Sequence, residues 1–109
     1  MAYTSKYRMA RISPTKARPV MDMIRGKRID EATIILQMSK LRAAVMIKGV
    51  LDSAVANADQ AEANVRRLII TDARADAGPT MKRFQPKDRG RAHPILKRTC
   101  HLTIAVDTK

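Results

Sequence analysis

The stretch Thr99 to Val106, TCHLTIAV, has the clearest strand pattern in the sequence. Every second residue is apolar, so one face would consist of Cys100, Leu102, Ile104 and Val106. The opposite face would consist of Thr99, His101, Thr103 and Ala105. A period of two is typical of a β-strand with one buried face. We therefore take this strand as the reference for the rest of the chain.

A second strand is predicted at 68–78, within RRLIITDARADAG, and a basic stretch, MKRFQPKDRGRAHPILKR, lies between the two at 81–98. If the two strands pair antiparallel, the intervening residues must leave and return together. The midpoint falls at Arg89-Gly90, and each extended limb would reach ~30 Å. The radius of gyration of a domain of this size is only ~13 Å. The sequence thus predicts a projecting β-hairpin arm at about 79–98.

The arm has little reason to be stable alone. Pro86 and Pro94 each remove a donor from the ladder, and the net charge of 81–98 is +6. We expect an arm that becomes ordered against an anionic surface. A solvated loop is the alternative, but Phe84, Ile95 and Leu96 give the segment an apolar character that such a loop does not need.

The first half of the chain predicts one strand and three helices. Residues 2–12 alternate, with Tyr3, Tyr7 and Met9 on one face and Thr4, Lys6 and Arg8 on the other. Three helical segments follow: one from N-cap Ser13 and Pro14 to a stop at Gly26, one from N-cap Asp30, and one at about 40–60 capped by Ser39. Pro19 lies inside the first helix and removes a backbone donor.

The third helix carries the apolar stripe Ala44, Ile47, Leu51, Ala54, Val55 and Ala58, which has the helical period. The order β-α-α-α-β-arm-β favours an α+β fold. We expect a small three-stranded antiparallel sheet packed against three helices, with the long hairpin arm extending from it.

The positive charge lies in two blocks. The chain of 109 residues has a net charge of +12, of which 1–28 carries +7, 29–80 carries −1 and 81–98 carries +6. Two basic blocks around a neutral body indicate a polyanionic partner. Only 3% of the residues are aromatic, which argues against base stacking on aromatic rings as the main mode of binding.

Several classes of function find no support. One cysteine and two histidines are too few for a zinc site, and no Gly-rich phosphate loop is present, so we predict no catalysis, no metal and no cofactor. Cys100 is expected to be a buried thiol in a reducing compartment. No apolar run is long enough to span a membrane. The Arg-rich start superficially resembles a transit peptide, but its removal would take a candidate strand, so we expect a cytosolic protein.

Folded RNA presents phosphates at many angles, which suits two basic blocks and an arm. The rival is a DNA-architectural protein with basic β-arms, whose prolines act as wedges between base steps. That alternative requires an apolar dimer interface, and it assigns no function to the basic residues of 1–28.

Three segments carry a resemblance to a known family. GPTMKRFQPKDRGRAHPILKRTCHLTIAV, ISPTKARPVMDMIRGK and AAVMIKGVLDSAVANA resemble bacterial-type large-subunit ribosomal protein number twenty-two, from about Lys6 to Val106. The resemblance implies one domain over 1–109 that binds large-subunit rRNA, supports assembly and contacts neighbouring ribosomal proteins. It also implies that the hairpin lines the nascent-peptide exit tunnel. The location would be the cytoplasmic ribosome, and no homo-oligomer is expected.

The resemblance and the charge pattern together give two sets of site residues. The predicted rRNA contacts are Lys6, Arg8, Arg11, Ser13, Lys16, Arg18, Arg25, Lys27, Arg28, Lys82, Arg83, Arg89, Arg91, Lys97, Arg98, Thr99 and His101. The predicted tunnel-lining residues are Met81, Lys82, Arg83, Lys87, Asp88, Arg89, Gly90, Arg91 and Ala92. Among these, Met81 to Arg83 match the limb that the family ties to macrolide action.

The chain departs from the family pattern at four positions. Asp88 places an acid near a tip that is usually more basic, which disfavours direct phosphate contact there. Pro94 weakens pairing in the returning limb, Pro19 replaces an aliphatic residue, and Cys100 replaces a serine.

Overall fold

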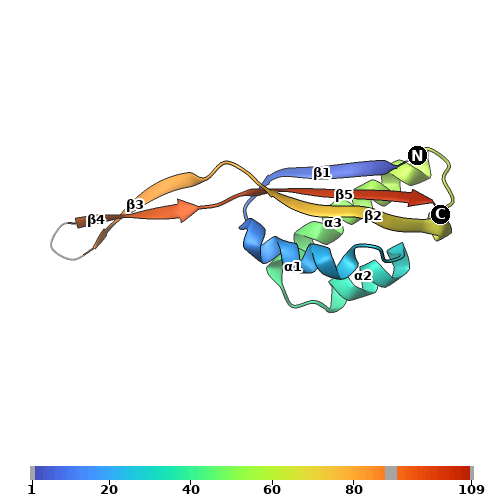
Figure 1. Cartoon of the computed structure of the whole chain (residues 1–109), viewed down its shortest axis with the longest axis horizontal. Helices are drawn as coiled ribbons and strands as arrows, with labels where there is room; N and C mark the ends of the chain where they lie inside the picture. Colours follow the sequence, from blue (N-terminus) through green and yellow to red (C-terminus); the bar gives the residue numbers. More distant parts are fainter. Residues whose placement is uncertain (1, 88–90, 109) are drawn as a thin grey trace.

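The computed structural model describes residues 2–87 and 91–108, and for 83–87 and 91–96 it describes the backbone only. The elements in chain order are β1 (Tyr3–Ala10), α1 (Pro14–Ile24), α2 (Ile29–Met38), α3 (Arg42–Gln60), a 3-10 turn (Val65–Arg67), β2 (Leu68–Ala77), β3 (Met81–Lys87), β4 (Arg91–Lys97) and β5 (Cys100–Thr108). This order, with three helices, an antiparallel sheet and a hairpin, confirms the predicted α+β fold (Figure 1).

The sheet has the strand order β1-β5-β2, and both pairings are antiparallel. β5 is central because both of its faces tolerate burial. Leu102, Ile104 and Val106 are fully buried on one face, while Thr103 is only 3% exposed on the other. Leu68 of β2 pairs with Thr108, and Ala77 pairs with Cys100. The predicted pairing of 68–78 with 99–107 is therefore confirmed.

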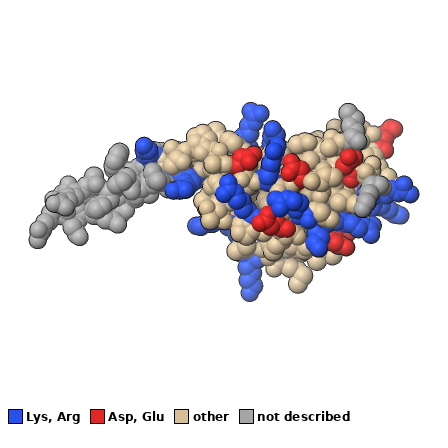
Figure 2. Space-filling model, viewed as in Figure 1, with Lys and Arg blue, Asp and Glu red and all other residues tan. Residues whose placement is uncertain are grey.

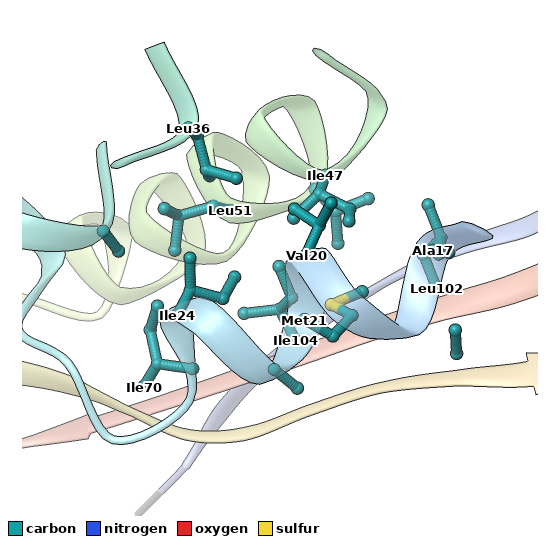
Figure 3. Close-up of a cluster of buried hydrophobic side chains, with 14 of the residues drawn as sticks. Ala17, Val20, Met21, Ile24, Leu36, Ile47, Leu51, Ile70, Leu102 and Ile104 are labelled. Carbon is teal, nitrogen blue, oxygen red and sulfur yellow. The ribbon is translucent and has the colours of Figure 1, made fainter. Parts of the chain in front are cut away.

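The helices cover one face of this sheet. α1 packs against β2, α3 packs against β1 and β5, and α2 packs on the other two helices (Figure 1). Figure 3 shows the core between these layers, with Val20, Met21 and Ile24 of α1 beside Ile47 and Leu51 of α3. In the stripe predicted on α3, Ala44, Ile47, Leu51, Ala54 and Ala58 are buried and Val55 is half-buried. Small side chains allow this helix to approach the strands closely.

The first helix has the predicted boundaries. Ser13 is the N-cap residue, Pro14 is the first helical residue, and Gly26 has the positive φ of +80° expected of a helix stop. The Gly26 N–H donates to the Ile70 carbonyl at 2.9 Å, which ties the end of the helix to β2. Pro19 lies on the exposed side, and the helix continues past it to Ile24.

Two predicted N-caps are wrong. α2 begins at Ile29 with Arg28 as its N-cap, so Asp30 lies with Glu31 inside the first turn. The reason is tertiary, because Arg28 has extended backbone and bridges to Ile69. Likewise, α3 begins at Arg42 and its N-cap is Leu41.

Ser39 instead ends α2. Its hydroxyl accepts a hydrogen bond from the Leu41 N–H at 3.3 Å, within the turn between the two helices. The side chain thus stabilises the connection and not the start of α3.

The alternation predicted for the first strand is interrupted by a β-bulge. Tyr7 pairs with Leu102, but Ala10 pairs with Cys100, so Arg8 and Met9 together lie opposite His101. Met9 adopts a positive φ of +57°, and its N–H donates to the His101 Nδ1 atom at 3.1 Å. The bulge takes Met9 off the face predicted for it with Tyr3 and Tyr7, and Met9 is 54% exposed, while Tyr7 stays in register opposite Leu102 and is 44% exposed.

β3 and β4 form a separate two-stranded ribbon that projects from the body (Figure 1). Its register runs from Met81 opposite Lys97 to Lys87 opposite Arg91. The Cα radius of gyration is 16.8 Å and the extents are 62 × 25 × 16 Å, compared with ~13 Å for the radius of a compact domain of this length. The predicted turn at Arg89-Gly90 lies outside the described residues.

Candidate nucleic-acid interface

The predicted rRNA contacts are spread over four parts of the structure. Lys6 and Arg8 lie on β1, and Arg11, Ser13 and Lys16 lie around the start of α1. Arg18 lies on α1, Arg25 is its C-cap residue, and Lys27 and Arg28 join it to α2. Lys82, Lys97, Arg98, Thr99 and His101 lie where the arm meets the body. Figure 2 shows lysine and arginine side chains over much of the visible face and at the root of the arm.

Arg18, Arg25 and Arg28 donate hydrogen bonds to carbonyl oxygens of the protein itself. The Arg18 Nε atom donates to the Ala75 carbonyl at 3.3 Å, and the Arg28 guanidinium donates to the Arg66 carbonyl at 3.3 Å. Arg25 donates to the Ala73 carbonyl and forms an ion pair of 2.7 Å with Asp22. Arg18 and Arg25 thus tie α1 to β2, so at least part of their role is structural.

A cleft of about 800 Å³ lies at the root of the arm, and we call it the arm-root cleft. It is lined by Arg11, Ile12, Ser13, Lys16, Pro19, Leu41, Arg42, Ala43, Lys97 and Arg98. The two basic blocks, which are about eighty residues apart in the sequence, therefore meet at one surface. Five of the lining residues are cations and none is an acid.

Among the side chains that the structure describes, none of the five cations of the arm-root cleft forms an ion pair. Arg74 provides a contrast, because it lies 3.5 Å from Asp72 and 3.9 Å from Asp76. Like charges gathered without counter-charges raise the local potential, which attracts anions. The five cations and the absence of an acid in its lining make the cleft a strongly cationic hollow.

Two helices begin at the arm-root cleft. The N-cap residues of α1 and α3 are Ser13 and Leu41, and neither forms a side-chain capping hydrogen bond. The N-terminal ends of helices carry partial positive charge and unpaired N–H groups. Both helix ends therefore add to the positive electrostatic potential that the five cationic side chains produce in the cleft.

Arg42 is the cation of the cleft that the sequence prediction missed. The net charge of 29–80 is −1, so composition gives no sign of a basic site there, although Arg42 is the first residue of α3. A base in the first turn of a helix is electrostatically unfavourable, and the adjacent Leu41 is 51% exposed. These two features were the available signal, but only the fold brings them beside the arm.

Thr99 and His101, two predicted rRNA contacts, have partners within the protein. Thr99 is 2% exposed, and its hydroxyl donates to the Pro79 carbonyl at 2.6 Å. His101 accepts from the Met9 N–H through Nδ1, which places its ring proton on Nε2. Both side chains stabilise the junction between the sheet and the arm.

Most of the predicted tunnel-lining residues lie where little is described. Met81 is half-buried and Lys82 is exposed at the start of β3. The side chains of Arg83, Lys87, Arg91 and Ala92 lie outside the described part, as do Asp88, Arg89 and Gly90 entirely. The roles assigned to these residues stay predictions.

A smaller hollow of about 460 Å³ lies against the exposed side of the sheet. Lys6, Arg8 and His101 contribute to it, but so does Asp76. The acid offsets part of the positive charge, so this hollow is a weaker anion site than the arm-root cleft.

Comparison with known proteins identifies the family. The family model described as ribosomal protein L22p/L17e matches residues 5–107. The chain belongs to this family. It is 53% identical over 97 residues to large ribosomal subunit protein uL22c of Porphyra purpurea, covering 88% of this chain and 84% of that protein. It is 50% identical over 97 residues to large ribosomal subunit protein uL22c of Pyropia yezoensis, covering 88% and 83%.

Membership of the L22p/L17e family confirms the resemblance, and the chain is a structural, non-enzymatic constituent of the ribosome. The prediction that it is no enzyme is thereby confirmed.

Cys100 is fully buried as predicted, and burial raises the pKa of its thiol, while the nearby charge of Arg18 partly lowers it. Among the described residues, no helix has the length and apolarity needed to cross a membrane.

Proposed function

We propose that this L22p/L17e protein is a constituent of the large ribosomal subunit that binds large-subunit rRNA through its basic N-terminal segment and its arm. The observation that carries the proposal is the arm-root cleft, where Arg11 and Lys16 of the first basic block meet Lys97 and Arg98 of the second. The two algal relatives are both named as large ribosomal subunit proteins, which supports the assignment to that subunit.

The shape of the molecule suits folded RNA. The molecule is 62 Å long but only 25 × 16 Å in its other two dimensions, so its projecting arm can pass between RNA helices while the body stays on their surface. Cations along the arm and at its root then meet phosphates from several directions. Thirteen arginines outnumber nine lysines, and the guanidinium fork matches phosphate oxygens with two hydrogen bonds.

The family resemblance supports three finer roles. The β3-β4 hairpin lines the nascent-peptide exit tunnel, with 87–92 facing the nascent polypeptide and Met81 to Arg83 in the limb tied to macrolide action. The body contacts neighbouring large-subunit proteins. By joining separate rRNA segments, the arm and the body support subunit assembly.

Binding to large-subunit rRNA at several salt concentrations tests the central claim. Replacing Arg11 and Arg98 by Ala removes two cations of the arm-root cleft. The matched control replaces Arg66 and Arg67 by Ala, since these exposed arginines precede Leu68 and so lie at the opposite end of the sheet.

We expect the cleft variant to bind more weakly and to lower the salt slope by about 0.7–0.9 for each phosphate that it no longer neutralises. The control should bind nearly as the unmodified chain does. Equal slopes for the two variants would contradict the placement of rRNA at the cleft. Duplex DNA that displaces the rRNA at equal concentration would favour the DNA-architectural rival.

A further inference from the structure

The arm-root cleft has an apolar wall that phosphate binding does not require. Ile12, Pro19, Leu41 and Ala43 line it together with the five cations. Leu41 is 51% exposed, so its side chain contributes little to the core of the free protein. Pro19 is exposed too, so the cleft presents an apolar surface directly beside its five cations. A ligand with both an anionic part and an apolar part would be complementary to that combination.

The size of the cleft indicates a ligand larger than one phosphate group. Its volume of about 800 Å³ lies within the roughly 300–1,000 Å³ typical of pockets that enclose small organic ligands. In RNA, the unit that combines a phosphate with a flat apolar face is a nucleotide whose base is unpaired. Paired bases are stacked inside a helix and cannot present that face to the wall.

We propose that the arm-root cleft receives one unpaired nucleotide of the RNA. The phosphate lies among Arg11, Lys16, Arg42, Lys97 and Arg98, and the base packs against Ile12, Pro19 and Leu41. This inference rests on the proposed binding of rRNA and deepens it, because it turns a general cationic surface into a site for a particular kind of nucleotide.

The chemistry of the wall fits a chain that is poor in aromatics. Proteins that bind unpaired bases usually stack them on aromatic rings or on guanidinium planes. No aromatic residue lines this cleft, whereas Arg11, Arg42 and Arg98 all do. A base can therefore stack on a guanidinium plane on one side and on the proline and leucine side chains on the other.

Amide chemical-shift titration of the free, full-length chain by NMR tests the site directly. The probes are inorganic phosphate, adenosine 5′-monophosphate and a short peptide rich in glutamate. We expect the nucleotide to shift the amides of Ile12, Leu41 and Ala43. It should bind about fivefold tighter than inorganic phosphate or better, because one stacked base contributes at least that factor.

Three variants separate the contributions. Leu41→Ser should lower the affinity for the nucleotide toward that for phosphate, because Leu41 contacts only the base. The affinity for phosphate itself should not change. Arg42→Ala should lower the affinity for both the nucleotide and phosphate. Arg67→Ala is the matched control, because it removes one exposed cation at the far end of the sheet. It should leave both affinities unchanged.

Equal affinities for phosphate and nucleotide, or shifts away from the cleft, would overturn the proposal. Tighter binding of the acidic peptide than of the nucleotide would overturn it too, and would assign the cleft to a protein partner. The titration contains no rRNA, so its result is independent of the proposed function. Retained rRNA binding with no nucleotide response refutes the nucleotide site alone.

Discussion

Gly78 lies where β2 ends and the arm begins, and its neighbours leave no room for a side chain. A Cβ atom added there would lie 2.7 Å from the Thr99 Oγ1 atom and 3.3 Å from the His101 Cε1 atom. The Gly78 N–H also donates to the Thr99 carbonyl at 3.0 Å, which fixes the backbones together. We therefore predict that Gly78→Ala destabilises the junction on which the arm is mounted.

The size of this destabilisation follows from the hydrogen bond that Thr99 would lose. Thr99 is 2% exposed and its hydroxyl donates to the Pro79 carbonyl, so moving it away leaves buried polar atoms without a partner. Such a change costs about 1–3 kcal/mol. The lower backbone entropy of unfolded Ala offsets about 0.5–1 kcal/mol. The net decrease in the free energy of unfolding is then about 0.5–2 kcal/mol, or up to roughly 1 M in the urea midpoint.

Gly49 provides the matched control. It lies exposed within α3, and a Cβ there would meet nothing within 4 Å. Gly49→Ala should raise the free energy of unfolding by about 0.5–1 kcal/mol, because alanine favours the helix. The same substitution at the two glycines should therefore give opposite signs in urea unfolding followed by circular dichroism.

A double-mutant cycle tests the cause. Thr99→Ala removes the atom that the new Cβ would meet, so the cost of Gly78→Ala should largely disappear in that background. If Gly78→Ala alone is as stable as the unmodified chain, Thr99 moves freely and the reasoning is wrong. If its cost is unchanged with Thr99→Ala, the clash lies elsewhere.

Three further predictions concern positions away from the cleft. Glu62 follows the end of α3 with a positive φ of +61°, so Glu62→Gly should stabilise the chain by about 1 kcal/mol in thermal unfolding; a decrease in stability would contradict this. Burial raises the pKa of Cys100 above its ordinary value of 9.0, although Arg18 partly lowers it. The unfolded chain therefore releases the thiol proton first, and stability should fall as pH rises above that value, less so in Cys100→Ala. Arg25→Ala removes the hydrogen bond to the Ala73 carbonyl and should cost about 1 kcal/mol in urea, whereas an effect on rRNA affinity alone would show that its structural role is dispensable.

Local patterns were sufficient for much of the fold. The alternation of 99–106, the apolar stripe on 44–58 and the Gly26 stop all reflect backbone geometry that a residue and its near neighbours set. The N-caps at Asp30 and Ser39 failed because a bridge from Arg28 to Ile69 and a turn after α2 fix the helix starts instead. A cap is a weak local preference of about 1 kcal/mol, which tertiary pairing overrides.

The first strand shows the same limit. The sequence of 2–12 alternates regularly, but one extra residue opposite His101 shifts the register and turns Met9 outward. Nothing within the strand itself signals that shift, because the hydrogen bond that holds it comes from β5. Long-range pairing thus decides which face of the strand is buried.

By itself, the sequence determined the class of fold, the existence of the arm and four of the five cations in the arm-root cleft. Periodicity and net charge are properties of short segments, so they can be read before the chain folds. Only the tertiary structure decided which cations bond within the protein, as Arg25 does to the Ala73 carbonyl, and which line the arm-root cleft. It also placed Arg42 and Leu41 beside Lys97 and Arg98, because the packing of α3 against the sheet sets distances between residues that are far apart in the chain.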